Sequence, residues 1–397
     1  MAQALRRTGV SVDLLERASE ARSTGYQLNV LPNGKYALGQ LGLLDALSEC
    51  GHGVPIRAFV FLDGLTDRVI QRIVFPPTGR YTGTSYYRAD LHKTLLHALE
   101  GGPPECNRTV LAVVDDGSRD RVHVQFSDGE TREFDFVVAA DGLHSKIRHD
   151  LFPEHRGFVP FFDALLFGAQ IDLNGNTAGE RRFAEQLRNG EFVQISAPGI
   201  SVVLSAAGQG RFGVIMLMAA SERTGQVSSA ADAKALARGL TRHVRDARVH
   251  HAIESASWEP GNPFIWHIGD IDPLPAFHAG RVALCGDAAH AMLPVVGQGA
   301  NQAFEDAMVL ARLLREAGKS DVPSILERYS AERAPHVARL QRIGRRSASM
   351  ALTRSRFQHF LAGVGMRVFL KRSFEDLGRH MLRYAHADSH FRIEAGL

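Results

Sequence analysis

The chain has 397 residues, 45% hydrophobic and 22% charged, which is the composition of a globular protein with one large domain or two. Its net charge of +3 and the lack of a basic–aromatic array argue against a dedicated nucleic-acid-binding role. Cys50, Cys106 and Cys285 are widely spaced and match neither a disulfide nor a metal pattern. No segment reaches the roughly 20 apolar residues that span a bilayer, and the start lacks a signal peptide, so we expect a cytoplasmic protein.

The first part of the chain alternates between predicted strands and helices. Residues 10–17 are typical of the second strand of a dinucleotide-binding βαβ unit, which would end at Glu16. Residues 36–50 carry helical apolar spacing after a Pro-Asn-Gly turn. The other predicted elements are strands within 54–75, a helix over Arg88–Leu99, a hairpin of Val110–Val114 with Arg121–Phe126, and a strand over Glu133–Ala139.

Residues 154–275 have a different pattern. Apolar segments at 165–172, 192–196, 201–205 and 211–218 are separated by turn signals, and a helix is predicted over about Ser229–Arg245. Short strands separated by turns favour antiparallel pairing. We therefore expect a distinct α+β block with an antiparallel sheet, which is the candidate substrate domain.

The most informative stretch of the chain is residues 281–306. It predicts a short buried strand over Val282–Leu284, a Gly-Asp turn, a loop of small residues and a helix from about Ala300. Gly286 leaves no bulk at the strand end, so a ligand can approach the backbone there. The carboxylate of Asp287 can accept hydrogen bonds from ligand hydroxyls at the same place. For the Gly-Asp pair alone, a tight strand-to-helix turn without a ligand is an equal alternative.

The loop that follows carries two further glycines. Gly297 and Gly299 place free backbone N–H groups at a helix N-terminus, which favours partial negative charge on a ligand. The whole stretch therefore suits a sugar-like chain beside an electron-rich ring.

Three segments resemble motifs of the FAD-dependent aromatic hydroxylases, the para-hydroxybenzoate hydroxylase-like flavoprotein monooxygenases. Residues 281–306 resemble the second flavin-binding motif, whose aspartate contacts the flavin ribityl chain and whose loop lies against the isoalloxazine. Residues 135–148 resemble the Asp-Gly motif near the FAD pyrophosphate, and residues 87–92 resemble a helix start whose arginine contacts the flavin side. The resemblance implies cofactor contacts from Glu16, Arg17, Arg88, Asp141, Gly286, Asp287, Pro294, Gly297, Gly299, Ala300 and Asn301.

The resemblance also implies the fold. We expect an α/β protein with a Rossmann-like FAD-binding domain that is incomplete at its N-terminus, an inserted α+β substrate domain and a C-terminal helical segment. The expected boundaries are 1–153 and 276–335 for the two parts of the FAD-binding domain, 154–275 for the substrate domain and 336–397 for the C-terminal helices.

One motif of a dinucleotide-binding unit is missing before Glu16. The fingerprint places Gly-x-Gly-x-x-Gly about 20 residues before the ribose-binding acid, but only fifteen residues precede Glu16. Residues 1–8 resemble the tail of the crossover helix, so we expect the first strand and the glycine loop to lie before Met1. The alternative is that the protein has lost normal FAD binding.

The implied activity is hydroxylation of an aromatic or similar electron-rich small molecule, with NADH or NADPH as the electron donor. In such enzymes the reduced flavin reacts with molecular oxygen to give a C4a-hydroperoxide, which transfers one oxygen atom. This chemistry needs neither a metal cluster nor a nucleophilic triad, and no catalytic side chain can be assigned. For His290 a structural role is the simpler interpretation than a catalytic one. Glu305 and Asp306 are interpreted as charges at a helix N-terminus rather than as catalytic acids.

The substrate pocket is less readable from the sequence. Apolar residues on strands are usually core, so a pocket position is the less common reading for each candidate. The substrate-binding candidates are Phe167, Gln194, Met216 and Phe264, with Phe161, Phe162 and Met218 as further lining residues.

Two alternatives in function remain open, and a third question concerns the C-terminal region. The first alternative is a reductase or halogenase of the same fold, although the halogenase Trp-x-Trp-x-Ile-Pro stretch is absent. The second is a non-catalytic binding protein. Residues 333–374 contain ten arginines and lysines and no acid. They predict helices packed on the FAD-binding domain or, alternatively, a peripheral contact with an anionic membrane.

Overall fold

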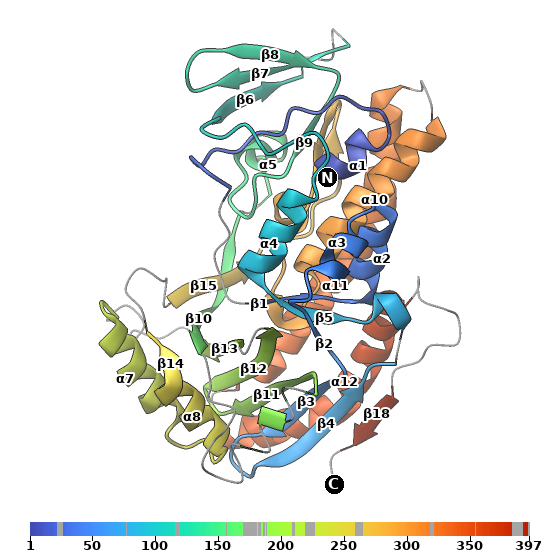
Figure 1. Cartoon of the computed structure of the whole chain (residues 1–397). Helices are drawn as coiled ribbons and strands as arrows, with labels where there is room; N and C mark the ends of the chain where they lie inside the picture. Colours follow the sequence, from blue (N-terminus) through green and yellow to red (C-terminus); the bar gives the residue numbers. More distant parts are fainter. Residues whose placement is uncertain are drawn as a thin grey trace.

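A computed structural model describes most of the chain. It covers residues 1–21, 27–76, 78–115, 117, 120–155, 157–169, 181, 184–185, 187, 189–208, 211–218, 227–258, 265–317, 321–353, 355–382 and 392–395. Figure 1 shows the large sheet with helices α7 (Ala230–Thr241) and α8 (Ala247–Ser255) in its lower part, and smaller sheets and the N-terminal helices above.

The large sheet contains strands from both ends of the chain. Its strand order is β14-β10-β13-β12-β11-β3-β4-β18, and β15 also pairs with β10. The bounds are β3 (Ala58–Asp63), β4 (Arg68–Val74), β10 (Val159–Ala169), β11 (Glu191–Ala197), β12 (Ile200–Gly208), β13 (Arg211–Met218), β14 (Ala256–Ser257), β15 (Ile265–Asp270) and β18 (Arg392–Ala395).

The pairing of this sheet is mixed. β3 and β11 run parallel, and the other neighbours are antiparallel. The strands predicted within 54–75 and 154–275 are confirmed, but they form one sheet that crosses the boundary predicted at residue 154. The reason is that β3 pairs with β11. A sequence pattern predicts each strand separately and does not show which strands pair.

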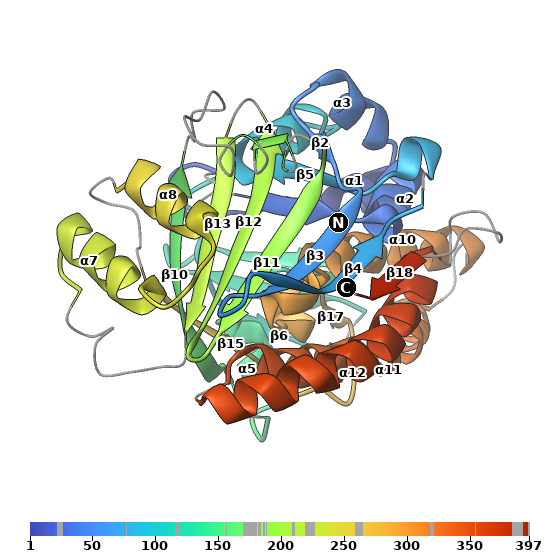
Figure 2. The same cartoon turned by 90° about the horizontal axis from the view of Figure 1, so that it is seen from below.

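The two faces of the large sheet carry different side chains because successive residues of a strand point to opposite faces. Val193, Val202 and Met216 pack in one buried cluster with Ala233 of α7 and Ile253 of α8. In Figure 2, α7 and α8 lie on one side of the sheet, while the long helices α11 (Val322–Ala351) and α12 (Arg356–Leu382) lie on another. The face opposite α7 and α8, here called the inner face, is the one that can meet a ligand.

The N-terminal region follows the prediction only in part. The expected helix over 36–50 is two helices, α2 (Pro32–Gln40) and α3 (Leu44–Glu49), because Gly42 between them has a φ of 72°. Val10 to Glu16 was predicted as a strand, but within the described residues only Leu15 pairs, as an isolated bridge to Glu105. Leu14 and Glu16 also share backbone hydrogen bonds with Glu105 and Arg108, so this end of the segment does have a parallel neighbour.

The remaining N-terminal elements surround these segments. They are α1 (Ala2–Arg6), α4 (Arg88–His97), the 3-10 turn η1 (Gly79–Tyr81), and a small sheet of β1 (Gln27–Val30), β5 (Thr84–Tyr87) and β2 (Val54–Pro55). The helix predicted from Arg88 is confirmed.

Two other small sheets follow, and the second of them positions the Asp141-Gly142 and Gly286-Asp287 motifs. One is β6 (Val110–Val114), β7 (Val122–Phe126) and β8 (Thr131–Phe134), and the other is β16 (His278–Ala279), β17 (Val282–Leu284) and β9 (Val137–Ala139). The strand predicted over 133–139 is thus divided between β8 and β9. Because β9 and β17 run parallel, their carboxyl ends lie at the same edge. The Asp141-Gly142 and Gly286-Asp287 motifs therefore meet at one place.

The C-terminal part is helical, as predicted. After β17 come α9 (Asp287–His290), the 3-10 turn η3 (Pro294–Val296) and α10 (Gly299–Ala317), which begins one residue before the predicted start; α11 and α12 follow. A further short helix on the β9 side is α5 (Lys146–Leu151). No helix within the described residues is long and apolar enough to cross a membrane.

A buried arginine holds the helices together behind the second motif. Arg333 of α11 donates to Asp306 at 2.8 Å and to Glu305 at 3.0 Å, and all three side chains are at most 2% exposed. Burial disfavours the charge on Arg333, but the two carboxylates outweigh it and raise its pKa. Burial likewise works against the charge of Asp306, yet neighbouring His290 and Arg333 hold the pKa of Asp306 well below its usual value. Glu305 and Asp306, expected as helix N-terminal charges, are instead members of this buried network.

Arg333→Leu should destabilise the protein by about 3–5 kcal/mol, because it leaves two buried carboxylates without their cation. Urea unfolding monitored by circular dichroism measures this loss. Arg328→Leu is the matched control on the same helix, because Arg328 forms an exposed pair with Glu316 at 3.2 Å, and it should cost no more than about 1 kcal/mol. Equal losses in the two variants would contradict this account.

Candidate functional site

The turn between β17 and α9 forms the floor of the candidate site. Gly286 adopts φ 61° and ψ −140°, a conformation that L side chains rarely adopt. Its N–H donates to the buried carboxylate of Asp306 at 2.9 Å, and His290 contacts the same oxygen at 2.7 Å. Asp287 is exposed at this turn, whereas His290 is fully buried. His290 is therefore structural, and Asp287 is the carboxylate that a ligand can reach.

Arg148 connects the two motifs. It lies on α5, whose first turn is capped by Ser145, and its guanidinium donates to the carbonyl oxygens of Asp287, Ala288 and Leu143 at 3.3, 3.1 and 2.7 Å. Burial lowers the pKa of Arg148, and the nearby carboxylates of Asp141 and Asp287 oppose this shift. A cation thus clamps the Gly286–Asp287 turn to the loop after β9.

Asn301 fixes the loop at the start of α10. Its side chain accepts from the N–H of Leu31 at 2.9 Å and donates to the carbonyls of Asn29 and Gly297 at 3.0 and 2.8 Å. A Cβ at Gly34 would lie 2.0 Å from Asn301 Oδ1, so only glycine fits there. The side-chain amide of Asn301 therefore ties β1 to this loop. The cofactor contact predicted for Asn301 stays a prediction.

The glycines of the loop leave its backbone open. Gly297 has a φ of 62°, in the left-handed region, and Gly299 is the first residue of the 19-residue helix α10. A Cβ at Gly299 would lie 3.9 Å from Asp287 Oδ1, so the helix start and the carboxylate are neighbours. Together they offer N–H donors and one carboxylate acceptor on the same surface.

The other predicted cofactor residues lie at several places around this surface. Arg88 is exposed at the first position of α4, and Asp141 is exposed in the loop after β9. Glu16 is half-buried, and its carboxylate accepts from the N–H of Ala18 at 2.8 Å, while Arg17 is exposed. Pro294 starts η3, and Ala300 follows Gly299 in α10. The residues that sequence reasoning missed are Arg148, Asn33, Gly34 and Arg333, which act through contacts with segments far away in the chain.

The predicted substrate residues do not share one face. Gln194 of β11 lies on the inner face, where it donates to Ser201 at 3.0 Å. Met216 is fully buried in the cluster with α7 and α8, which weighs against a contact with substrate, and Met218 shares that cluster. Phe161 is 38% exposed. Phe264 and the side chains of Phe162 and Phe167 lie outside the described part of the structure, although the backbone of Phe167 pairs with Val214.

The inner face is more polar than the sequence reading implied. Ser201 and Ser196 lie 3.2 Å apart between their hydroxyls, next to Gln194, and Ser205 contacts Gln27 of β1. This face also reaches the loop of the second motif, because Leu217 of β13 belongs to one apolar cluster with Leu293. The alternation of strand residues explains this face. Gln194 was among the predicted substrate-binding residues, whereas Ser196, Ser201 and Ser205 were not.

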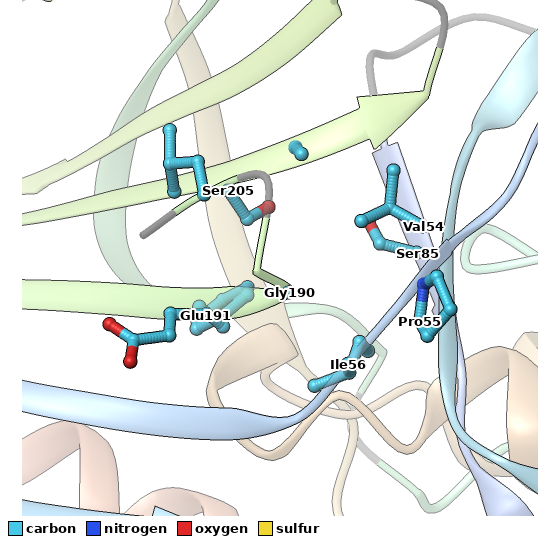
Figure 3. A pocket seen from close by; sticks show the side chains of 10 residues that line it. Val54, Pro55, Ile56, Ser85, Gly190, Glu191 and Ser205 are labelled. Carbon is cyan, nitrogen blue, oxygen red and sulfur yellow. The ribbon is translucent and has the colours of Figure 1, made fainter. Parts of the chain in front are cut away.

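A small pocket lies at one end of the inner face. Figure 3 shows it between Ser205 on one side and Val54, Pro55 and Ser85 on the other, with the carboxylate of Glu191 pointing away from Pro55. Glu191 pairs with Arg72 at 2.6 Å. None of the lining residues belongs to the predicted cofactor set, so this pocket is not the candidate flavin site.

Comparison with known proteins shows the family of the chain. Residues 1–343 match the model of the FAD binding domain family, and the chain belongs to that family. The chain is 27% identical over 376 residues to the FAD-dependent urate hydroxylase of Klebsiella pneumoniae, covering 92% of each chain. It is 30% identical over 366 residues to a 3-amino-4-hydroxybenzoate 2-monooxygenase of Streptomyces platensis, covering 87% of this chain and 83% of that protein.

Solved structures share the fold. Klebsiella pneumoniae HpxO complexed with FAD and uric acid has a TM-score of 0.76 at 23% identity, and covers 96% of this chain and 92% of that one. A salicylate hydroxylase substrate complex has a TM-score of 0.72 at 21% identity, with 97% and 94% covered. The protein is an FAD-dependent monooxygenase of the aromatic hydroxylase class, with the α/β fold of these flavoproteins.

The residues present fit FAD. Three features converge on one surface: the Asp287 carboxylate, Gly286 at the open strand end and the N-terminus of α10. The carboxylate can accept hydrogen bonds from the ribityl hydroxyls, and the N–H groups of the helix can donate to the electron-rich ring.

Asp287→Ala should weaken FAD binding about 10- to 100-fold, because a charge-assisted hydrogen bond is lost while the buried network is left intact. Flavin absorbance retained after dialysis measures the loss, with far-ultraviolet circular dichroism as the check on folding. Asp150→Ala is the control, since Asp150 is an exposed acid of the neighbouring helix α5 that pairs with Lys146. Unchanged flavin occupancy in Asp287→Ala would remove Asp287 from the site.

Proposed function

We propose that this monooxygenase uses NADH or NADPH and molecular oxygen to hydroxylate an aromatic or similarly electron-rich small molecule. The observation that carries the proposal is the meeting of the Asp141-Gly142 and Gly286-Asp287 motifs at the ends of two parallel strands, clamped by Arg148. Bound FAD supplies the electron transfer and oxygen chemistry. The chain binds and orients that cofactor and keeps water from it.

The proposed contacts with FAD follow from the chemistry of each group. Asp287 accepts hydrogen bonds from the ribityl hydroxyls, and Gly286 leaves the space for them. The N–H groups of Gly299 and Ala300 stabilise partial negative charge on the flavin ring, above the loop of Pro294 and Gly297 that Asn301 holds. The remaining proposed contacts are Glu16 and Arg17 with the adenosine end and Arg88 and Asp141 with the flavin side and pyrophosphate.

The proposed division of labour follows the chain. Residues 1–153 and 276–335 form a Rossmann-like unit for FAD, residues 154–275 supply the substrate side, and residues 336–397 add the C-terminal helices. The parallel pair β9–β17 supports the first assignment. Leu217 and Leu293 belong to one buried cluster, which supports a position of the substrate side next to the flavin loop. β3 and β4 contribute to the substrate side although they precede residue 154.

The inner face supports a polar aromatic substrate. Gln194, Ser201 and Ser205 provide amide and hydroxyl groups that can donate or accept hydrogen bonds. Such groups discriminate between substrates, because a ligand that cannot form these hydrogen bonds leaves them unpaired. The relatives named above act on polar aromatic or heteroaromatic compounds by their names, which agrees with this face. Phe167 and Phe264 remain proposed aromatic contacts from the same block.

An oxygen-label experiment tests the reaction class. The protein is supplied with FAD, with either NADH or NADPH, and with a panel of phenols, aminohydroxybenzoates and purines. The masses of the products are measured by mass spectrometry. In labelled oxygen gas the product should gain one labelled atom, and in labelled water it should gain none. Incorporation from water alone, or turnover without oxygen, would favour the same-fold reductase or halogenase alternative. A colourless protein that takes up no FAD would favour the non-catalytic alternative.

We also propose that α12 rests on an anionic membrane surface. Phe357, Phe360, Leu361 and Val364 are 51–70% exposed, and their spacing places them along one side of the helix. Residues 333–374 carry ten basic side chains and no acid. Arg333 and Arg345 are paired with carboxylates, whereas Arg346 and Arg356 are exposed. Apolar insertion combined with positive charge is the pattern of interfacial helices on anionic lipid.

Sedimentation with vesicles tests this contact. The protein should pellet with phosphatidylglycerol vesicles and not with phosphatidylcholine vesicles, less so at high salt because the charge attraction is screened. Phe357→Ser with Phe360→Ser should abolish pelleting, whereas the control Leu111→Ser, at a side chain 50% exposed on β6, should not change it. If pelleting is absent in the unmodified protein, or survives the double substitution, α12 does not bind the membrane.

A further inference from the structure

Three helices bring a carboxylate and two imidazoles to one point, which Gln302 links to Gln298 of the flavin loop. Glu305 comes from α10, His336 from α11 and His380 from α12. Glu305 is fully buried, His380 is 8% exposed and His336 is half-buried. We call these three side chains the His-His-Glu cluster. None of them belongs to the proposed FAD contacts, and His380 lies beyond residues 1–343, the part matched by the family.

The distances in the cluster suit a metal ion. The Nε2 atoms of His336 and His380 are 3.4 Å apart, and His380 Nε2 is 3.3 Å from Glu305 Oε1. All three ligand atoms lie within 4.8 Å of one another. A zinc ion with ligand bonds of about 2.0–2.2 Å in tetrahedral geometry separates neighbouring ligand atoms by about 3.3–3.5 Å. Two of the three edges therefore already have that length.

The chemistry of the facing atoms also favours a cation. Two neutral imidazoles that face each other through their Nε2 atoms can share only one proton between those atoms. A metal ion can instead accept the lone pair of both nitrogens. The side-chain amide of Gln302 donates to His380 Nε2 at 2.9 Å, so His380 Nε2 is unprotonated and presents its lone pair at this point. Glu305 supplies the negative charge that a divalent ion requires.

The carboxylate is held in place by neighbours that are not ligands. Glu305 Oε2 accepts from Arg333 at 3.0 Å, and Oε1 accepts from Asn33 at 2.7 Å. Such outer contacts orient a ligand before the metal arrives. Arg333 also donates to Asp306, so the cluster is attached to the buried Arg333 network.

We propose that the His-His-Glu cluster binds one divalent transition metal, with zinc as the ion best suited to two imidazoles and a carboxylate. The ion joins α12 to α10 and α11 and thereby fixes the C-terminal helix on the rest of the molecule. This role is structural, is independent of the proposed hydroxylation, and departs from the sequence-based expectation that no metal site exists.

Metal titration of the full-length, FAD-loaded protein tests the proposal. After treatment with a chelator, the protein should take up one equivalent of Zn²⁺ or Co²⁺ per chain, and its melting temperature should rise. His336→Ala and His380→Ala should each weaken uptake by about 100-fold or more, because a ligand is lost rather than an outer contact. His359→Ala is the control, since His359 is a buried histidine of α12 that lies 3.3 Å from Asp63, and it should bind the metal as the unmodified protein does.

His380→Cys guards against simple misfolding of the alanine variants. It keeps a metal ligand, so it should retain Co²⁺ and add thiolate-to-cobalt absorption to the difference spectrum. Absence of Co²⁺ bands in the unmodified protein, or uptake unchanged in His336→Ala, would overturn the proposal. Both readouts are independent of turnover, so a failure here differs from a failure of the oxygen-label experiment.

Discussion

The pairing of Arg333 with Asp306 and Glu305 is the interaction on which the rest of the site depends. The buried guanidinium lies between two buried carboxylates, so all three groups can stay charged in the interior, where an unpaired charge would be destabilising. Asp306 uses its other oxygen to hold the N–H of Gly286. The conformation of the Gly286–Asp287 turn is thus set from α11, more than 40 residues further along the chain.

Two other long-range contacts complete the positioning of the cofactor surface. Arg148 reaches from the β9 side to the carbonyls of the turn, and Asn301 ties the loop before α10 to β1. Because each contact joins backbone to a buried side chain, the surface itself can remain open. Asp287 stays exposed and available, while Asp306 and His290 behind it are buried.

The same charged region has a second consequence at its far end. Glu305 faces Arg333 with one oxygen and His380 with the other. One residue of α10 therefore belongs both to the support of the flavin turn and to the contact with α12. A metal in the His-His-Glu cluster would extend this support to the C-terminal helix, whose opposite side carries the exposed apolar stripe from Phe357 to Val364.

The sequence by itself determined the class of enzyme, most of the strands and helices, and the local chemistry of Asp287, Gly297 and Gly299. These depend on neighbours within a few residues, where spacing and residue type decide the outcome. Only the tertiary structure decided which residues support the site, since Arg148, Gly34 and Arg333 act on segments 27 or more residues away. It also decided that Met216 faces the core while Gln194 lies on the inner face, because the face of a strand depends on its register and on what packs against it. Likewise, only the tertiary structure showed that the extended stretch before Glu16 pairs with the segment at Glu105, as a single bridge at Leu15.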